Sequence, residues 1–159
     1  MLNISKRPKL KLDNDIPPCN IRIDKEGKWY HTIWGTELIH KPMRLFLFSL
    51  LERDEKGRYI LRLKNQRCYL EVEDTPFVVM RVDRAHTFII TLNDETQEEL
   101  DLGTLWVGNQ NVLYCKIREG KFEARFSRPA YYQLTNYVEF DELEERFYIP
   151  LGDHKYFIA

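Results

Sequence analysis

Three carboxylates lie close together near the middle of the chain, and their types and spacing suit chemistry. They are Glu71, Glu73 and Asp74. Carboxylates at this spacing are able to bind a divalent cation or to serve as a general acid and base. However, Glu71 and Glu73 fall on the outer face of a predicted strand, and Asp74 has the residue type that turns favour. No second group of ligands accompanies them, so a structural role is favoured over a metal site or an acid–base pair.

A second candidate site lies where a predicted helix begins. Ser127 has the type that caps a helix, Arg128 falls in the first turn, and Arg125 points outward from the preceding strand. The N–H groups at the start of a helix attract phosphate or carboxylate groups, and two arginines would strengthen that binding. The competing role for the arginines is an ion pair with a surface acid such as Glu123. The sequence favours the ion pairs and leaves the anion site as the sharper alternative.

The cysteines and histidines give no comparable pattern. The three cysteines are far apart and odd in number, so they cannot all pair within the chain, and none has Cys-x-x-Cys spacing. Cys68 and Cys115 fall in strand-like alternation and are expected to be small buried hydrophobic residues. His31 and Cys19 flank one predicted hairpin, but no nucleophile motif surrounds them. We therefore predict no catalytic residue, no metal site and no cofactor.

The composition narrows the function classes. The 159 residues are 43% hydrophobic and 31% charged, which is typical of a soluble globular protein. The net charge of −1 provides no field that would attract nucleic acid or an anionic membrane. The longest apolar run, Leu45 to Leu51, is too short to span a bilayer. We predict a cytoplasmic protein in a reducing environment, with no nucleic-acid or membrane partner.

Two stretches with the same pattern predict the elements that would hold these residues. Each shows a hairpin with a Glu-Gly turn, a helix opened by a proline, and then a strand. The first copy has its hairpin at 21–30, its proline at Pro42 and its strand at 58–63; the second has 112–126, Pro129 and 146–151. We predict a β-rich α+β fold of two similar halves, each with a helix packed on an antiparallel sheet, from an internal duplication. The predicted parts are a mobile tail at 1–14, an N-terminal half at 15–84, and a C-terminal β-rich half with one helix at 85–159.

The helix predicted over 43–53 has apolar residues on both sides. Its expected core stripe consists of Met43, Phe46, Leu47, Leu50 and Leu51. Leu45 and Phe48 fall on the opposite side, beside charged residues. Such a helix is either sandwiched between other elements or offers a contact surface, so Leu45 and Phe48 are a candidate interface, including one for a homodimer.

Four stretches of this chain resemble a bacterial family known as domain of unknown function family 1285. They are 21–30 (IRIDKEGKWY), 72–78 (VEDTPFV), 122–129 (FEARFSRP) and 149–152 (IPLG), in the same order as in the family. The resemblance covers most of 19–158, and the second stretch is the most specific. It implies a small two-part α+β protein, with no established activity or cofactor. The chain departs from the family between Leu61 and Arg67, where the family usually shows Thr-Pro and then Val-Glu-Lys.

Two functions follow from these observations. The favoured one is a non-catalytic soluble binding or interaction module, whose partner is an unidentified protein, a small molecule or a second copy of the chain. The alternative is a small hydrolase or ligand-binding protein that acts on a phosphorylated or acidic small molecule. That alternative would use Glu73 and Asp74 together with the Arg125 and Arg128 end of the second helix.

Overall fold

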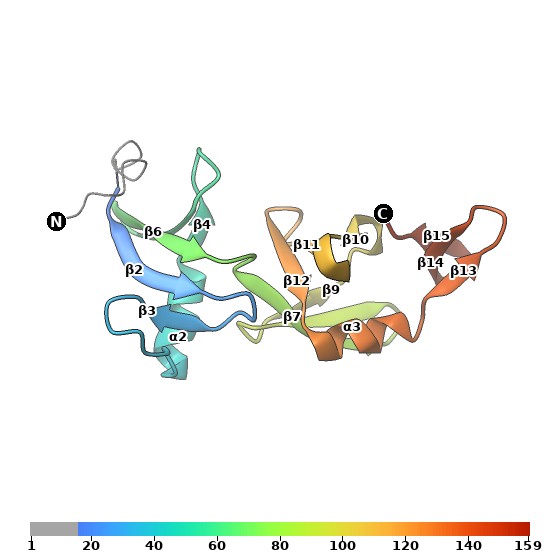
Figure 1. Cartoon of the computed structure of the whole chain (residues 1–159), viewed down its shortest axis with the longest axis horizontal. Helices are drawn as coiled ribbons and strands as arrows, with labels where there is room; N and C mark the ends of the chain where they lie inside the picture. The colour runs from blue at the N-terminus through green and yellow to red at the C-terminus, as the bar shows by residue number, and fades with distance from the viewer. Residues whose placement is uncertain (1–15) are drawn as a thin grey trace. The chain divides into compact units, whose positions relative to one another are not determined.

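The computed structural model describes residues 16–159, which divide into two compact units. The first unit consists of 16–23 and Lys28–Val72, and the second of Asp24–Gly27 and Glu73–Ala159. The predicted tail at 1–14 lies outside the described residues. Figure 1 shows the elements of both units, and each unit is considered by itself below.

The first unit contains one helix and a five-stranded sheet. Its strands run in the order β3-β2-β6-β5-β4 across the sheet. All neighbours pair antiparallel except β2 and β6, which are parallel. The predicted antiparallel sheet is therefore mixed. The elements are β2 (Pro18–Ile23), β3 (Trp29–His31), α2 (Lys41–Ser49), β4 (Leu51–Arg53), β5 (Tyr59–Leu63) and β6 (Gln66–Val72).

The buried residue of helix α2 is Phe48, which the sequence assigned to the outer side. His40 caps the helix, because its Nδ1 accepts a hydrogen bond from Met43 N at 3.3 Å. Phe48 is 3% exposed and packs against Trp29 with 4.7 Å between ring centroids, whereas Met43 and Phe46 are half exposed. Leu45 is half-buried. The expected core stripe is thus wrong for Met43 and Phe46, and Phe48 is a core residue rather than an exposed contact.

The second unit is built on a six-stranded sheet with the order β10-β11-β12-β7-β8-β9. Its one parallel pair is β12 with β7; the other neighbours are antiparallel. The strands are β7 (Phe77–Arg84), β8 (Phe88–Leu92), β9 (Gln97–Glu99), β10 (Trp106–Val107), β11 (Leu113–Ile117) and β12 (Phe122–Phe126). Short 3₁₀ turns at Leu102–Thr104 and Asn109–Asn111 flank β10.

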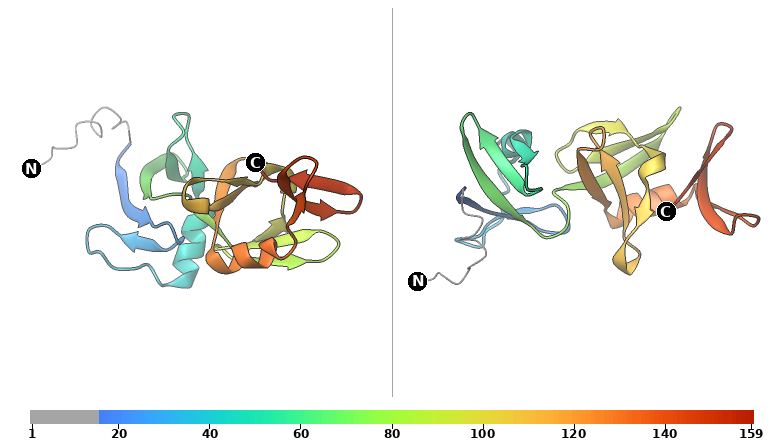
Figure 2. Two further views of the ribbon diagram at one scale, coloured as in Figure 1. Left: turned by 45° about the vertical axis from the view of Figure 1, so that its right-hand side comes forward. Right: turned by 90° about the horizontal axis from the view of Figure 1, so that it is seen from above.

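The chain then forms α3 (Arg128–Thr135) and a three-stranded antiparallel sheet. The strands of this sheet are β13 (Glu139–Asp141), β14 (Arg146–Leu151) and β15 (His154–Phe157). The two views in Figure 2 show this sheet, in red, beside the six-stranded sheet rather than within it. The helix is held on β7, since Gln133 Oε1 accepts a hydrogen bond from Val82 N at 2.7 Å.

The division between the units falls earlier than the predicted boundary after residue 84. Strand β7 pairs with β8 and β12, which places it wholly in the second unit. The turn Asp24–Gly27 also belongs to that unit. There, Asn93 Nδ2 donates to Gly27 O at 3.1 Å, and a Cβ at Gly27 would lie 2.6 Å from that nitrogen. Gly27 also has a φ of +86°, so both the conformation and the close approach require glycine.

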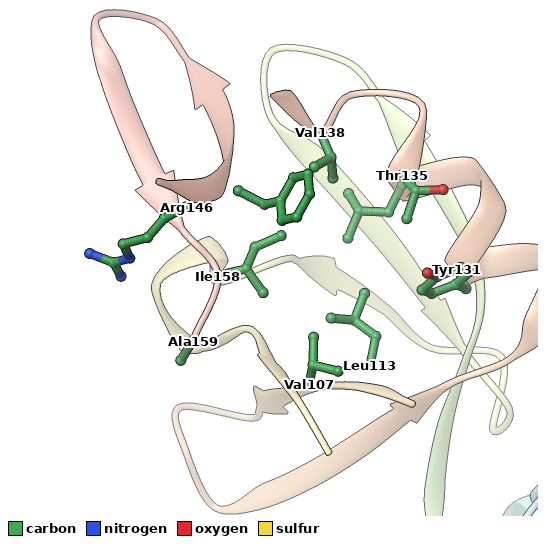
Figure 3. A pocket seen from close by; sticks show the side chains of 10 residues that line it. Val107, Leu113, Tyr131, Thr135, Val138, Arg146, Ile158 and Ala159 are labelled. Carbon is green, nitrogen blue, oxygen red and sulfur yellow. The ribbon is translucent and has the colours of Figure 1, made fainter. Parts of the chain in front are cut away.

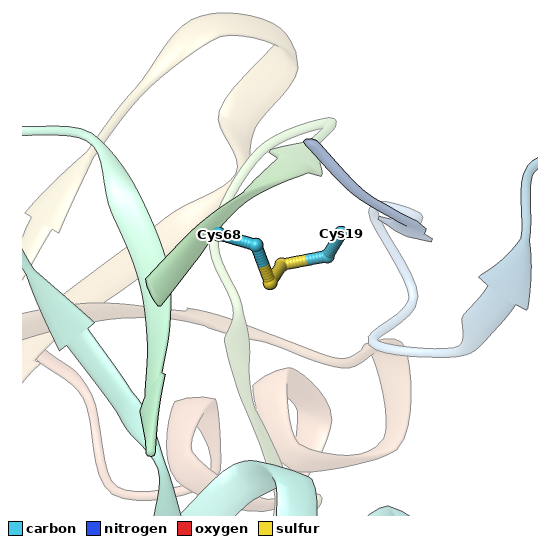
Figure 4. Close-up of a disulfide and its surroundings, with 2 residues drawn as sticks. All are labelled: Cys19 and Cys68. Carbon is cyan, nitrogen blue, oxygen red and sulfur yellow. A yellow bond between two sulfur atoms is a disulfide. The ribbon is translucent and has the colours of Figure 1, made fainter. Parts of the chain in front are cut away.

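Cys19 and Cys68 form a disulfide between β2 and β6 (Figure 4). The expectation that Cys68 is a small buried hydrophobic residue is therefore wrong, whereas Cys115 is buried as predicted and is not part of a disulfide. Three cysteines in sequence do not reveal which two meet, because the pairing depends on β2 lying beside β6. Within 16–159, no helix has both the length and the apolar character needed to cross a membrane.

Candidate functional site

The two candidate sites from the sequence meet in one polar network of the second unit. Asp74 Oδ2 accepts a hydrogen bond from Arg125 Nη1 at 2.8 Å and another from the Tyr114 hydroxyl at 2.7 Å. The backbone N–H of Arg125 donates to Thr75 Oγ1 at 3.1 Å, which ties β12 to the chain just before β7. Asp74 and Arg125 therefore neutralise each other, and the expected pairing of the arginine with an acid is confirmed with Asp74 rather than Glu123.

The network changes the acid–base chemistry of the tyrosine. Burial, followed by the hydrogen bond to Asp74, raises the pKa of Tyr114 to about 12. Both effects favour the neutral phenol, because a buried phenolate next to a carboxylate would be poorly solvated and repelled. Tyr114 thus acts as a hydrogen-bond donor at neutral pH, and it stacks on Trp106 at 5.0 Å between ring centroids.

The other two carboxylates of the cluster lie apart from this network. Glu73 Oε1 accepts a hydrogen bond from Lys25 N at 3.2 Å, and Glu71 is exposed on β6. Among residues 16–159, no group of three or more His, Cys, Asp or Glu side chains is placed to hold a metal ion. The three acids that are close in sequence therefore have three different surroundings.

The start of α3 has the predicted cap and a small hollow beside it. Ser127 Oγ accepts a hydrogen bond from Ala130 N at 3.3 Å, as expected of an N-cap residue. Arg125 and Arg128 both line a hollow of about 250 Å³, which we call the arginine hollow. Arg128 is exposed, while the charge of Arg125 is already balanced by Asp74. Arg125, Ser127 and Arg128 thus lie close together, as predicted. Because Arg125 is paired with Asp74, Arg128 would be the main positive charge available to a bound anion.

The sequence did not indicate a larger cavity next to the arginine hollow, which shares Leu113 and Tyr131 with it. This apolar pocket has a volume of about 610 Å³ and is formed by α3, β10, β11, β14 and the residues after β15. In Figure 3 the aliphatic side chains of Val138, Leu113 and Ile158 surround a common space, and the guanidinium of Arg146 is turned away from it. The lining residues are Val107, Leu113, Tyr131, Leu134, Thr135, Val138, Arg146, Phe147, Ile158 and Ala159.

Backbone hydrogen bonds fix the walls of the apolar pocket. Ile158 N donates to Phe147 O at 3.0 Å, and Ala159 N donates to Leu105 O at 3.2 Å. Val107 N donates in turn to Ala159 O at 3.1 Å, so the chain after β15 connects β14 with β10. Arg146 stacks over the ring of Phe157 at 4.5 Å, which keeps its charge on the outer side. The pocket is therefore framed by paired backbone rather than by loose loops.

The sequence contains one signal for this pocket. Tyr131, Leu134 and Val138 are three and four residues apart, the spacing of one side of a helix, and all three line the pocket. Part of the opposite wall comes from two segments of two residues each, β10 and Ile158–Ala159. Segments this short carry no periodicity that would reveal a shared cavity.

Two solved structures have a similar fold. A DUF1285 family protein from Shewanella baltica OS155 matches with a TM-score of 0.62 and 20% identity, over 74% of this chain and 91% of its own. A DUF1285 family protein from Silicibacter pomeroyi DSS-3 matches with a TM-score of 0.71 and 21% identity, over 90% of this chain and 80% of its own. No protein-family model matches the sequence, and no curated protein does. The resemblance to DUF1285 proteins is thus confirmed at the level of the fold.

Proposed function

We propose that the chain is a non-catalytic binding module whose second unit takes up a small apolar molecule in the apolar pocket. The observation that carries this proposal is the pocket itself, a cavity of about 610 Å³ with a mainly aliphatic lining. Ligand sites in proteins are typically concave, of roughly 300–1,000 Å³, and mostly apolar with a few polar groups. Here the polar side chains of the lining are those of Tyr131, Thr135 and Arg146.

The lining also supports binding rather than catalysis. A general acid or base must lie within hydrogen-bond reach of the reacting atom. The ten lining residues include no Asp, Glu, His or Cys, and the Arg146 guanidinium points outward. The side chains available to a ligand therefore offer shape, apolar contact and two hydroxyl groups. An aromatic or branched aliphatic molecule without a buried charge fits this chemistry best.

Thermal shift with two apolar probes tests the proposal. Indole and isobutylbenzene should raise the melting temperature, because a ligand that binds only the folded state stabilises it. Val107→Trp should abolish the rise by filling the cavity from β10, and Val107 is 45% exposed, so the larger ring is tolerated. The matched control is Lys116→Trp, an exposed position on β11 outside the lining. Equal shifts in both variants, or none in the unmodified protein, would refute the proposal.

The alternative function, a hydrolase or binding protein for a phosphorylated or acidic molecule, has weaker support. It would use the arginine hollow, where Asp74 already neutralises Arg125 and the Ser127 hydroxyl already caps α3. Hydrolysis of an aryl phosphate that is lost in Arg128→Ala and retained in Val107→Trp would favour this alternative over the apolar pocket.

We also propose that the two units arose by duplication, as the repeated sequence pattern suggests. The order β2-β3-α2-β4-β5-β6 corresponds to β11-β12-α3-β13-β14-β15, each a two-strand segment, a helix and a three-strand meander. The sheets have diverged, since β6 joins β2 in one sheet while β13–β15 form a sheet of their own. A duplication would explain why Pro42 and Pro129 occupy the same place in each helix.

A cytoplasmic location stays a proposal, and the disulfide sets a condition on it. Disulfides persist in oxidising compartments, whereas those in the cytoplasm are usually transient. A cytoplasmic protein with Cys19 and Cys68 paired must therefore exchange that bond with cellular thiols. Alkylation of thiols in intact cells, followed by mass spectrometry, would show whether the two cysteines are paired there.

A further inference from the structure

The Cys19–Cys68 disulfide lies where the sheet of the first unit is irregular. Its Cα atoms are 4.9 Å apart on the neighbouring parallel strands β2 and β6. Pro18 lies opposite Tyr69 and Arg22 opposite Glu71, and the register shifts between these two pairs. Asn20, next to Cys19, has a φ of +62°. The covalent bond thus spans a stretch in which regular ladder pairing of the backbone is interrupted.

One cysteine of this bond lies at the wall of a groove. Cys68 lines a groove of about 700 Å³, which we call the Cys68 groove, and Cys19 is not among its lining residues. Both cysteines are half-buried rather than enclosed. The rate of thiol–disulfide exchange depends on which sulfur an incoming thiolate can reach. The groove walls include Leu47, Leu50, Leu61 and Leu63, with the polar residues Asn65 and Gln66 at one side.

The third cysteine, Cys115, does not take part in thiol–disulfide exchange. Cys115 is 0% exposed in the second unit, and burial raises the pKa of its thiol far above the usual range. A thiol that stays protonated and inaccessible neither attacks a disulfide nor is modified. Thiol chemistry in residues 16–159 is therefore confined to Cys19 and Cys68.

The first unit has other contacts that hold β2 in place when the bond opens. Strand β2 also pairs with β3 through Ile21, Arg22 and Ile23, and Ile23 and Trp29 are fully buried. Next to the disulfide, Tyr69 N donates to Pro17 O at 2.9 Å, and further along Arg22 and Ile23 pair with Glu71 and Val72, so β2 and β6 have contacts on both sides of the bond. Opening and closing of the disulfide is therefore compatible with a folded first unit.

We propose that the disulfide is a thiol-exchange site at which a low-molecular-weight thiol becomes attached to Cys68 in the groove. The thiolate of the small molecule attacks Cys68 Sγ and forms a new S–S bond. The Cys19–Cys68 bond breaks, and Cys19 leaves as a thiolate that takes up a proton. A second molecule of the thiol then attacks the sulfur of the attached one, which releases Cys68 as a thiol and the small molecule as its own disulfide. The two cysteines gain two electrons in total, and the small thiol supplies them.

This site is separate from the apolar pocket, because its residues all belong to the first unit. It makes the first unit a place of covalent modification, while the proposed ligand binding belongs to the second. The expected direction of attack follows from the groove, because an adduct on Cys68 would occupy the Cys68 groove, which Cys19 does not line. The preference for one cysteine is thus a property of the fold that unfolding should remove.

The test uses the full chain and glutathione as the small thiol. Protein purified without reductant should show one thiol after unfolding, that of Cys115, and three after reduction. Native protein is incubated with reduced glutathione, quenched by alkylation and mapped by mass spectrometry. We expect glutathione on Cys68 and the alkyl group on Cys19. Glutathione on Cys19 instead, or a native protein that never exchanges although the unfolded protein does, would overturn the proposal.

Two reduced variants give an independent readout of the same preference. With oxidised glutathione, Cys19→Ser should acquire the adduct on Cys68 at least about tenfold faster than Cys68→Ser acquires it on Cys19, because access controls the rate. In denaturant the two rates should become equal. Equal rates in the native proteins would contradict the role of the groove. Should either variant fail to fold, the mapping on the unmodified chain still decides the question.

Discussion

Asp74 accepts hydrogen bonds from Tyr114 and Arg125, and it illustrates how a residue's neighbours determine its role. In sequence it belongs with Glu71 and Glu73 as part of a possible acidic site. In the fold its charge is balanced by a guanidinium, and its second partner is a phenol held in the neutral form. An acid with both partners in place is a poor ligand for a metal ion, since binding would cost these hydrogen bonds.

The Tyr114 network leads to a prediction on pH. Asp74→Asn should lower the pKa of Tyr114 from about 12 toward its ordinary value of about 10, because the neighbouring negative charge is removed while burial remains. The measurement is an NMR titration of the tyrosine ring carbons. Asp83→Asn is the matched control, since it removes an exposed ion pair with Arg81 on β7. An unchanged pKa in Asp74→Asn would show that burial alone raises it.

The sign of the stability effect follows from the same shift. Tyr114 has a higher pKa in the folded state than in the unfolded state, so its contribution is complete below about pH 10 and is lost as pH rises toward about 12. In that range the unfolded chain releases the phenolic proton and the folded chain retains it. Asp74→Asn should therefore narrow the pH range over which stability falls, which urea unfolding at successive pH values would reveal.

At the scale of the elements, local signals in the sequence were sufficient for the turns and helix starts. The Glu-Gly turns at Gly27 and Gly120 have positive φ, Ser127 caps α3, and Pro42 falls in the first turn of α2. These features depend on a few neighbouring residues, so the sequence contains them. The parallel pairings of β2 with β6 and of β12 with β7 join distant segments. No local pattern reveals such partners, and the disulfide and the apolar pocket follow from them.

The orientation of α2 shows a related limit. Five of its nine residues are Met, Leu or Phe, and they lie on more than one side of the helix. Hydrophobicity alone therefore does not decide which side meets the sheet. The side of α2 that faces the sheet is set by the ring of Trp29 on β3, which packs against Phe48. The face with Met43 and Phe46 is left half exposed, so any contact surface on this helix would involve that face rather than Leu45 and Phe48.

A pair of alanine substitutions on α2 tests this orientation. Phe48→Ala should lower the free energy of unfolding by about 3–5 kcal/mol, because it leaves a cavity beside Trp29. Phe46→Ala should change it by about 0.5 kcal/mol or less, since Phe46 is 51% exposed. Both changes remove the same side chain from the same helix, so propensity effects cancel. Urea unfolding gives the two values. A larger loss of unfolding free energy in Phe46→Ala than in Phe48→Ala would mean that the core face predicted from the sequence is correct.

At the scale of the whole molecule, the two units have separate cores, and the disulfide lies in one of them. The bond joins residues 49 positions apart, so it restricts the unfolded chain over 19–68, a segment that belongs to the first unit except for the turn Asp24–Gly27. A loop of this length corresponds to roughly 4 kcal/mol of stabilisation in the chain-entropy model. The second unit contains its free cysteine at a buried position and has no such restraint among its residues.

Reduction should therefore destabilise the first unit and leave the second unchanged. We expect calorimetry of the oxidised protein and of the protein with a reductant to differ in one transition, which should fall by more than about 10 °C. Amide hydrogen exchange assigns the change: exchange in β5 and β6 should accelerate on reduction, while exchange in β7 and β8 should not. The second unit is thus the internal control. An equal acceleration in both sets of strands would mean that the units unfold as one cooperative body. Thiol exchange at Cys68 would then also lower the stability of the second unit, which contains the apolar pocket.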